Sequence, residues 1–251
     1  IFTILCYMKG IPLDDLHFFM KRDWKARQEL PEGADHILIF MPEGVEAGEY
    51  VSPPRISVGK EQFYSGTKGE FPFLLTALSC LKKDGSLAAI FPGAMLYREG
   101  SEAQIRKYLV DNNFVDCIIQ LPDNLFFGTS IATDILVMKK NKADNSILFI
   151  DATKECVKVT NNNKLTPENI DHIVDVFASR EDVEHVAHRA TYDEVVSNDY
   201  NLSVSTYVEA EDTREKVNIV ELNQQLKEIV AREQELRDRI DQIIAEIEVD
   251  A

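Results

Sequence analysis

Two loops near the middle of the chain carry residue types whose spacing fits a ligand site. They follow the apolar runs 87–91 and 115–121, which read as β-strands, and ligand sites of α/β sheets lie at strand ends. The first loop and the helix after it contain Arg98, Gly100, Glu102, Ile105 and Arg106. The second loop contains Leu121, Pro122, Leu125, Phe126, Gly128, Thr129, Ile131 and Thr133. This pattern predicts a binding site at one edge of a sheet.

Short apolar runs and helix-like segments alternate along the chain and must position these loops. The strand-like runs are 1–7, 36–40, 87–91, 115–121, 135–138 and 147–150. The helix-like runs are 71–81 and 101–112, and we expect Lys82, Lys83 and Gly85 to close the first of them. The glycine- and proline-rich stretch 44–70 reads as a long loop.

The chain divides into three parts on this reading. We predict an α/β domain over residues 1–150, a small mixed α/β region over 151–212 and a C-terminal helix within 213–251. In the mixed region, Thr166 is expected to cap a helix that begins at Pro167.

The two loops also resemble those of a known family. The pattern Arg98-x-Gly100-x-Glu102-x-x-Ile105-Arg106, followed by Leu121-Pro122 and Leu125-Phe126-x-Gly128-Thr129-x-Ile131-x-Thr133, is similar to the modification (M) subunit of type I restriction–modification systems. Asp199-Tyr200-Asn201-Leu202 also occurs there, and the resemblance is strongest over residues 71–208. It implies a Rossmann-like methyltransferase sheet, of which this chain holds a C-terminal portion. It also implies methylation of adenine N6 in DNA by S-adenosylmethionine.

The family's catalytic turn is altered in this sequence. An Asn-Pro-Pro-Tyr/Phe turn binds the extruded adenine in such enzymes, because the Asn accepts hydrogen bonds from the amino group and the aromatic ring stacks on the base. Following the strand at 36–40, the four motif positions hold Phe40, Met41, Pro42 and Glu43, of which Pro42 alone matches. A different register would use Pro53-Pro54, which also lacks the aromatic residue.

Cofactor binding is poorly supported by the sequence. The family's glycine-rich turn for S-adenosylmethionine does not occur in these 251 residues. Asp23, in Lys21-Arg22-Asp23-Trp24, resembles the family's Asp that contacts the cofactor adenine. We therefore expect that this chain does not bind S-adenosylmethionine and does not methylate DNA alone.

Each motif residue has a structural alternative. Leu121, Pro122 and Phe126 could line the target-base pocket. Alternatively, Leu125, Phe126 and Phe127 could pack the loop onto the sheet, which is the more common role of an apolar aromatic residue such as Phe126. Gly128 and Thr129 could approach the DNA backbone or form a tight turn. Arg98, Arg106 and Lys107 could contact phosphate or lie on a solvated helix face. His185 and His188 lack a third ligand at a telling spacing, so we expect no metal site.

Charge limits how this chain could meet DNA. The formal net charge is −16, and phosphate contacts need clustered Lys and Arg. We therefore expect DNA contact to be indirect, through an assembled complex. Four cysteines without a CxxC pair suit a reducing compartment, and no stretch reads as a signal peptide or membrane span. The expected location is the cytoplasm.

The C-terminal part carries a heptad pattern. Apolar residues alternate at steps of three and four, which predicts one amphipathic helix over residues 217–249. The stripe consists of Ile219, Leu222, Leu226, Ile229, Leu236, Ile240, Ile243 and Ile247, with Val230 and Ile244 beside it and Glu233 interrupting it. By resemblance, its partner would be the DNA-reading specificity subunit.

Two functions remain open at this point. The chain is either part of an active N6-adenine DNA methyltransferase or a catalytically inactive module that keeps the fold and the assembly helix. The residues at positions 40–43 favour the second for this chain.

Overall fold

The computed structural model describes residues 33–40, 55–58, 61–64, 70–126, 130–160, 162–211 and 219–249. Its centre is a six-stranded sheet with the order β1-β4-β6-β5-β7-β10. These strands are β1 (Ala34–Phe40), β4 (Leu81–Pro92), β5 (Val115–Gln120), β6 (Thr133–Lys139), β7 (Ile147–Asp151) and β10 (Ala187–Ala190). The expected α/β class with a Rossmann-like sheet is confirmed.

Four strands of the sheet run in one direction. β1 pairs with β4 and β5 pairs with β7 in parallel, while β6 runs antiparallel to both β4 and β5. β10 runs antiparallel to β7. The carboxyl ends of β1, β4, β5 and β7 therefore meet at one edge of the sheet, where β6 begins.

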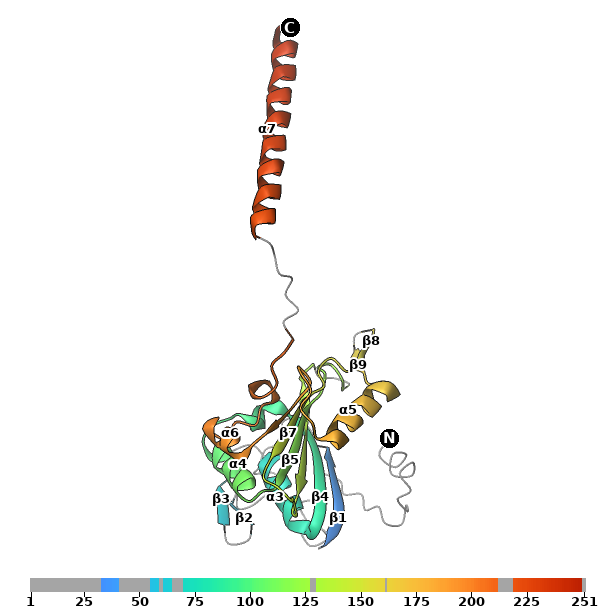
Figure 1. Ribbon diagram of the computed structural model, residues 1–251, viewed down its shortest axis with the longest axis vertical. Coiled ribbons are helices and arrows are strands. Elements are labelled where there is room, and N and C mark those ends of the chain that lie inside the picture. Colours follow the sequence, from blue (N-terminus) through green and yellow to red (C-terminus); the bar gives the residue numbers. More distant parts are fainter. Residues whose placement is uncertain are drawn as a thin grey trace. The chain divides into compact units, whose positions relative to one another are not determined.

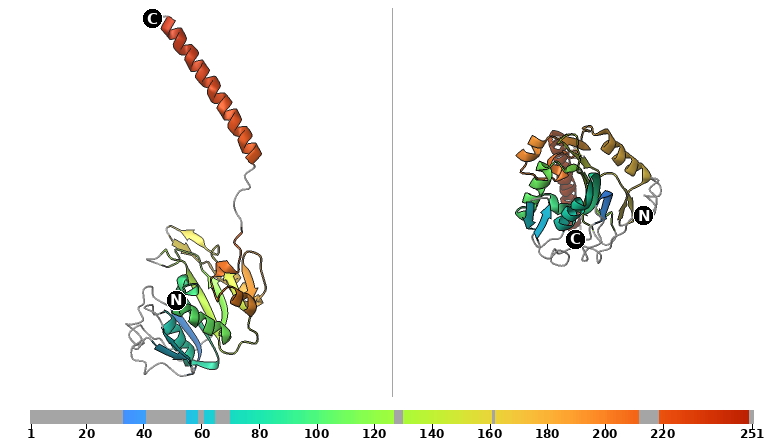
Figure 2. Two further views of the ribbon diagram at one scale, coloured as in Figure 1. Left: turned by 90° about the vertical axis from the view of Figure 1, so that its left-hand side faces the viewer. Right: turned by 90° about the horizontal axis from the view of Figure 1, so that it is seen from below.

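Helices cover both faces of the sheet, as Figures 1 and 2 show. One face packs against α3 (Glu70–Cys80), α4 (Ser101–Asp111), α6 (Tyr192–Ser197) and the short helices η3 (Gly93–Leu96) and η4 (Val204–Thr206). The other face packs against α5 (Pro167–Ser179), through Ile173 and Val176. The central strands β5 and β7 are buried on both sides, which explains their nearly continuous apolar sequences.

Local sequence signals account for two helix starts. Thr166 caps α5, since its hydroxyl accepts a hydrogen bond from the Asn169 amide and Pro167 occupies the first turn, as predicted. Gly100 precedes α4 with φ of 78°, a conformation that side chains rarely adopt, so the glycine of the Arg98-x-Gly100 pattern has a backbone role.

The expected closure of α3 by Lys82, Lys83 and Gly85 is wrong. The helix ends at Cys80, and β4 begins directly at Leu81. Ser86 to Ile90 of β4 pair in order with His36 to Phe40 of β1, so strand pairing governs this segment in place of a helix cap. Gly85 has no left-handed conformation.

Two hairpins lie outside the main sheet. β2 (Arg55–Val58) pairs with β3 (Glu61–Tyr64) inside the stretch that was expected to be a long loop. β8 (Val157–Val159) pairs with β9 (Asn162–Lys164) beyond the end of β7.

The chain forms two compact units, residues 1–210 and residues 211–251. Residues 151–210 of the expected mixed region therefore belong to the same unit as residues 1–150. The second unit contains α7 (Ile219–Val249), a single 31-residue helix, as predicted from the heptads. The apolar side chains of its stripe from Ile219 to Ile243 are each half exposed or more. Glu233, which interrupts the stripe, pairs with Arg237 of the same helix.

In the part of the chain that the structure describes, no helix combines the length and the apolar character needed to cross a membrane.

Candidate functional site

The carboxyl-end edge of the sheet brings the two sequence motifs together. Phe40 lies at the end of β1, and Phe126 lies in the loop that follows β5. Their ring centroids are 5.2 Å apart at an interplanar angle of 64°, an edge-to-face contact. Because β4 and β6 separate β1 from β5 in the sheet, this loop reaches across the ends of two strands.

The two rings differ from a typical core pair in their exposure. Phe40 is 53% exposed, and Phe126 is half-buried. A partly open aromatic pair at a strand edge offers apolar surface to a ligand such as a nucleobase. Leu121 and Pro122, by contrast, are buried beneath the loop, and the Leu121 amide bonds to the Thr133 carbonyl at 2.9 Å.

Several residues of the expected site lie outside the described residues. They are Asp23, Met41, Pro42, Glu43, Gly128 and Thr129. Their proposed roles stay predictions.

Asp134 is a residue of this edge that the sequence reasoning missed. It is the second residue of β6 and is 4% exposed. Its Cα pairs with Phe91 of β4 on one side and Gln120 of β5 on the other. Its carboxyl group lies so close to Gly93 that a Cβ at that position would overlap it. The pattern Asp134-x-Leu136-x-Met138 was the available signal, since alternate residues of a strand share one face.

The surroundings of Asp134 disfavour a charge. Among the described residues, none donates a hydrogen bond to its carboxyl group, and the desolvation caused by burial raises its pKa to about 7. A carboxyl group that titrates near neutral pH can hold or release a proton under cellular conditions. The structure therefore places this carboxyl group at the same edge of the sheet as the aromatic pair, with its side chain against Gly93.

The hairpin β8–β9 is hydrogen-bonded to the loop that follows β5, whose described residues 121–126 are called the base loop below. The Asn163 side-chain amide donates to the Asp123 carbonyl and to its Oδ1, both at 2.9 Å. The Asn163 backbone amide donates to the Asn124 carbonyl at 2.9 Å. Asn124 has φ of 48°, so these bonds hold the loop where it turns sharply. Asn163 and Asp123 are 40 residues apart, so no local sequence pattern indicates this contact.

The arginine of the first motif has a structural role. Both expectations for Arg106, a phosphate contact and a solvated face, are wrong, because the residue is 3% exposed. Its guanidinium donates to the carbonyls of Met95, Arg98 and Tyr200 at 3.0, 2.7 and 3.0 Å. It thereby ties η3 and α4 to the Asp199-Tyr200-Asn201-Leu202 segment. Leu202 adds a backbone bond to Leu96.

The other two basic residues of this motif also make internal contacts. Lys107 donates to Tyr200 Oη at 2.6 Å and to Asp111 at 2.9 Å. Arg98 contacts Glu102 one turn later at 3.4 Å.

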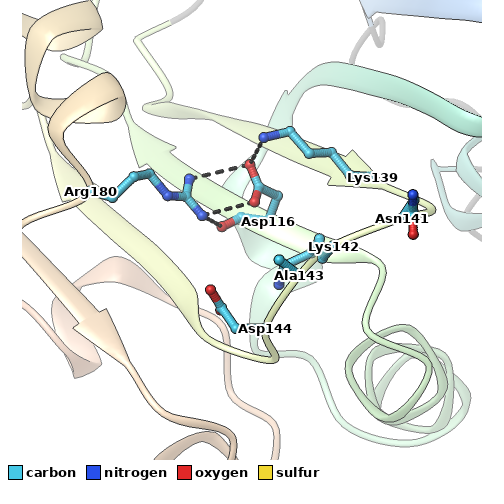
Figure 3. A pocket seen from close by; sticks show the side chains of 7 residues that line it. All are labelled: Asp116, Lys139, Asn141, Lys142, Ala143, Asp144 and Arg180. Atoms are coloured by element: carbon cyan, nitrogen blue, oxygen red, sulfur yellow. Dashed lines mark hydrogen bonds and ion pairs between the residues drawn. The ribbon is translucent and has the colours of Figure 1, made fainter.

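A small hollow of about 140 Å³ lies at the opposite edge of the sheet (Figure 3). Asp116, at the start of β5, is buried there and pairs with Lys139 and Arg180, each at 2.8 Å. These pairs neutralise most of the hollow's charge, and it does not contribute to the aromatic edge.

The histidines pair with nearby acceptors. His188 contacts Glu194 at 3.0 Å, and His185 contacts the Glu209 carbonyl at 2.9 Å. Within the described residues, no three His, Cys, Asp or Glu side chains gather as metal ligands.

Comparisons with known proteins identify the family and the relatives that this chain resembles. Residues 43–216 match the family model for N-6 DNA Methylase. The methylase subunit of the type I restriction enzyme MpnII, from Mycoplasma pneumoniae, is 46% identical over 186 residues, which are 73% of this chain and 34% of that protein. The MjaVII methylase subunit from Methanocaldococcus jannaschii is 35% identical over 157 residues, 60% of this chain and 27% of that protein. The chain thus spans about a third of the length of these relatives.

A solved structure agrees with the fold. The type I restriction–modification methyltransferase subunit from Streptococcus thermophilus is similar with a TM-score of 0.69 and 34% sequence identity. The similarity covers 82% of this chain and 45% of that one.

Proposed function

Because this chain belongs to the N-6 DNA methylase family, we propose that it is a C-terminal portion of a type I restriction–modification methylase subunit. The activity we assign to the complete system is transfer of a methyl group from S-adenosylmethionine to adenine N6 in DNA, in the cytoplasm. The edge-to-face pair of Phe40 and Phe126 carries the site assignment, since it sets a partly open aromatic surface at the carboxyl ends of the parallel strands.

For this chain we favour the inactive alternative. An adenine-binding turn needs an acceptor for the two amino hydrogens, and Phe40 offers a phenyl ring instead. Loss of one such polar contact lowers a rate by about 10²–10³ even in an intact site. Phe40 and Phe126 would still exclude water from a stacked base and orient it, but they move no proton.

The described residues include none that the family resemblance assigns to the cofactor. Asp23 lies outside them, and the glycine-rich turn that holds S-adenosylmethionine in this family has no counterpart in these 251 residues. We therefore derive no step through the cofactor from this chain's residues.

Assembly through α7 is the second part of the proposal. The exposed apolar stripe of this helix supports docking on helices of the specificity subunit, which would also supply basic surface that a chain of net charge −16 lacks. An isolated helix is marginally stable in water, so a partner that covers the stripe would also stabilise it.

Two measurements test the catalytic part. Calorimetric titration of the chain with S-adenosylmethionine should give no heat of specific binding, and one-to-one binding with a micromolar dissociation constant would contradict the proposal. Labelled methyl transfer to unmodified duplex DNA should not exceed the level without protein. A family member with an intact Asn-Pro-Pro-Phe turn serves as the positive control. Transfer by this chain that Pro42→Ala abolishes would establish a working catalytic turn here.

A further inference from the structure

We propose that the hairpin β8–β9 is an arm that contacts the DNA backbone beside the target base. This inference rests on the proposed function and adds a contact surface that no family motif identifies. It follows from where the hairpin lies, how it is fixed and which charges it carries.

The topology of the sheet determines where the hairpin lies. β5 and β7 are parallel neighbours, so the base loop after β5 and the hairpin after β7 leave from the same edge. Figure 1 shows the hairpin standing beyond the end of the sheet, on the side of α5. A ligand that reaches the Phe40–Phe126 edge therefore lies next to this arm.

The arm is held at a defined place against the base loop. Asn163 makes its three hydrogen bonds to Asp123 and Asn124, and the Asn162 side chain adds a longer one to the Asn124 carbonyl at 3.4 Å. Three short bonds between segments 40 residues apart fix the arm relative to the loop. The hairpin therefore has a fixed position at this edge of the sheet.

The charge of the arm is opposite to that of the chain. Residues 157–164 contain Lys158 and Lys164 and no acidic residue, in a chain of net charge −16. Both lysines are exposed, and neither pairs with a carboxylate in the described part of the chain. Lysine is a point charge on a flexible stem, which suits phosphate contacts without base selection.

The two faces of the hairpin present these groups differently. Lys158 is directly opposite Asn163 in the strand pairing, so it shares the face that meets the base loop. Lys164 lies on the other face with Val157 and Val159, which are 43% and 51% exposed. A two-stranded ribbon of this kind fits the width of a DNA groove, where both lysines would reach flanking phosphates.

The salt dependence of DNA binding tests the arm. The chain, assembled with its specificity subunit, is titrated with sheared unmodified genomic DNA at several KCl concentrations. Lys158→Gln/Lys164→Gln removes two phosphate contacts, so the slope of log affinity against log salt should become less steep by about 1.8. Between about 50 and 200 mM salt, the unchanged protein should then lose roughly tenfold more affinity than the variant.

A second variant controls for the change in net charge. Lys82→Gln/Lys83→Gln makes the same charge change at the start of β4, on the opposite edge of the sheet, with loss of the exposed ion pair between Lys82 and Asp35, and should leave the slope unchanged. The proposal is overturned if the hairpin variant keeps the original slope, or if the control loses as much. It is also overturned if the hairpin variant no longer co-purifies with the specificity subunit, which would make the arm a protein contact. An unchanged complex that binds no DNA would instead refute the proposed function.

Discussion

Replacing Asp134 by Asn should stabilise the protein above neutral pH. The carboxyl group is 4% exposed and has no hydrogen-bond donor among the described residues, so its ionisation in the folded state is unfavourable. Asn has nearly the same shape and no charge. The effect should therefore appear as a difference that grows with pH.

The sign and size follow from the pKa shift. Burial raises the pKa of Asp134 from 3.8 to about 7, so the folded state binds more protons than the unfolded state between these values. The contribution to stability is fully present below about pH 3.8 and is lost as pH rises through about 7. The rise of the pKa from 3.8 to about 7 corresponds to about 4 kcal/mol over the whole range, since each tenfold change in proton affinity is worth about 1.36 kcal/mol.

The assay is urea unfolding followed by circular dichroism from about pH 5.5 to about pH 8.5, a window that avoids the pI of about 4.7. Within it, the stability of Asp134→Asn relative to the unchanged protein should rise by about 2 kcal/mol, since about half of the rise in pKa lies above pH 5.5. Using only the change with pH cancels any constant cost of the new amide group.

Asp116→Asn is the matched control. That carboxylate is 3% exposed but pairs with Lys139 and Arg180, whose side chains reach solvent, so its loss should destabilise the protein throughout the window by about 1.5–3 kcal/mol. A constant difference between Asp134→Asn and the unchanged protein across the window would refute the reasoning. So would a difference that favours Asp134 at high pH.

Three further predictions concern other parts of the chain. Leu226→Asp/Ile240→Asp should abolish co-purification with the specificity subunit while the unfolding of unit 1–210 stays unchanged. The control Gln224→Asp/Gln242→Asp, which lies off the apolar stripe, should co-purify normally. Normal assembly of the first variant would contradict the docking role of α7. Arg106→Lys should lower the unfolding free energy by about 2–3 kcal/mol in urea titrations, because a lysine cannot serve three carbonyls that the guanidinium fork serves; an unaltered midpoint would be the contrary result. Gly93→Ala should lower the unfolding free energy by about 1–3 kcal/mol, because the new Cβ overlaps the Asp134 carboxyl group. The decrease should be smaller in an Asp134→Ala background, and equal decreases in both backgrounds would exclude this overlap.

The strands and the long helix could be predicted because their signals are local. Continuous apolar runs indicated β5 and β7, and the heptads indicated α7 within two residues of its observed start. The long β4 was missed at its beginning because Lys82, Lys83 and Gly85 also suit a helix end, and pairing with β1 decides between the two.

The candidate site was less accessible to sequence reasoning, because its contacts join distant segments. In the sequence Arg106 resembles a surface residue. In the fold its guanidinium bonds to the carbonyl of Tyr200, which is 94 residues away. The burial of Asp134 depends on its neighbours Phe91 and Gln120, and on Gly93 beside its carboxyl group. Strand alternation alone would have placed Asp134 on the buried face, but not at that glycine.

The attachment of residues 199–208 to the α/β unit determines where the chain would bear a pulling force. This segment leads toward α7 in the sequence, and it is attached by Arg106 and by the bond from Leu202 to Leu96 at the end of η3. η3 is also the short helix whose first residue, Gly93, lies against Asp134. Tension applied to α7 by a moving partner would be borne first by the bond between His185 and the Glu209 carbonyl and by Tyr207, which stacks on Phe149 at 3.8 Å, so that Arg106 and η3 are shielded behind these outer attachments.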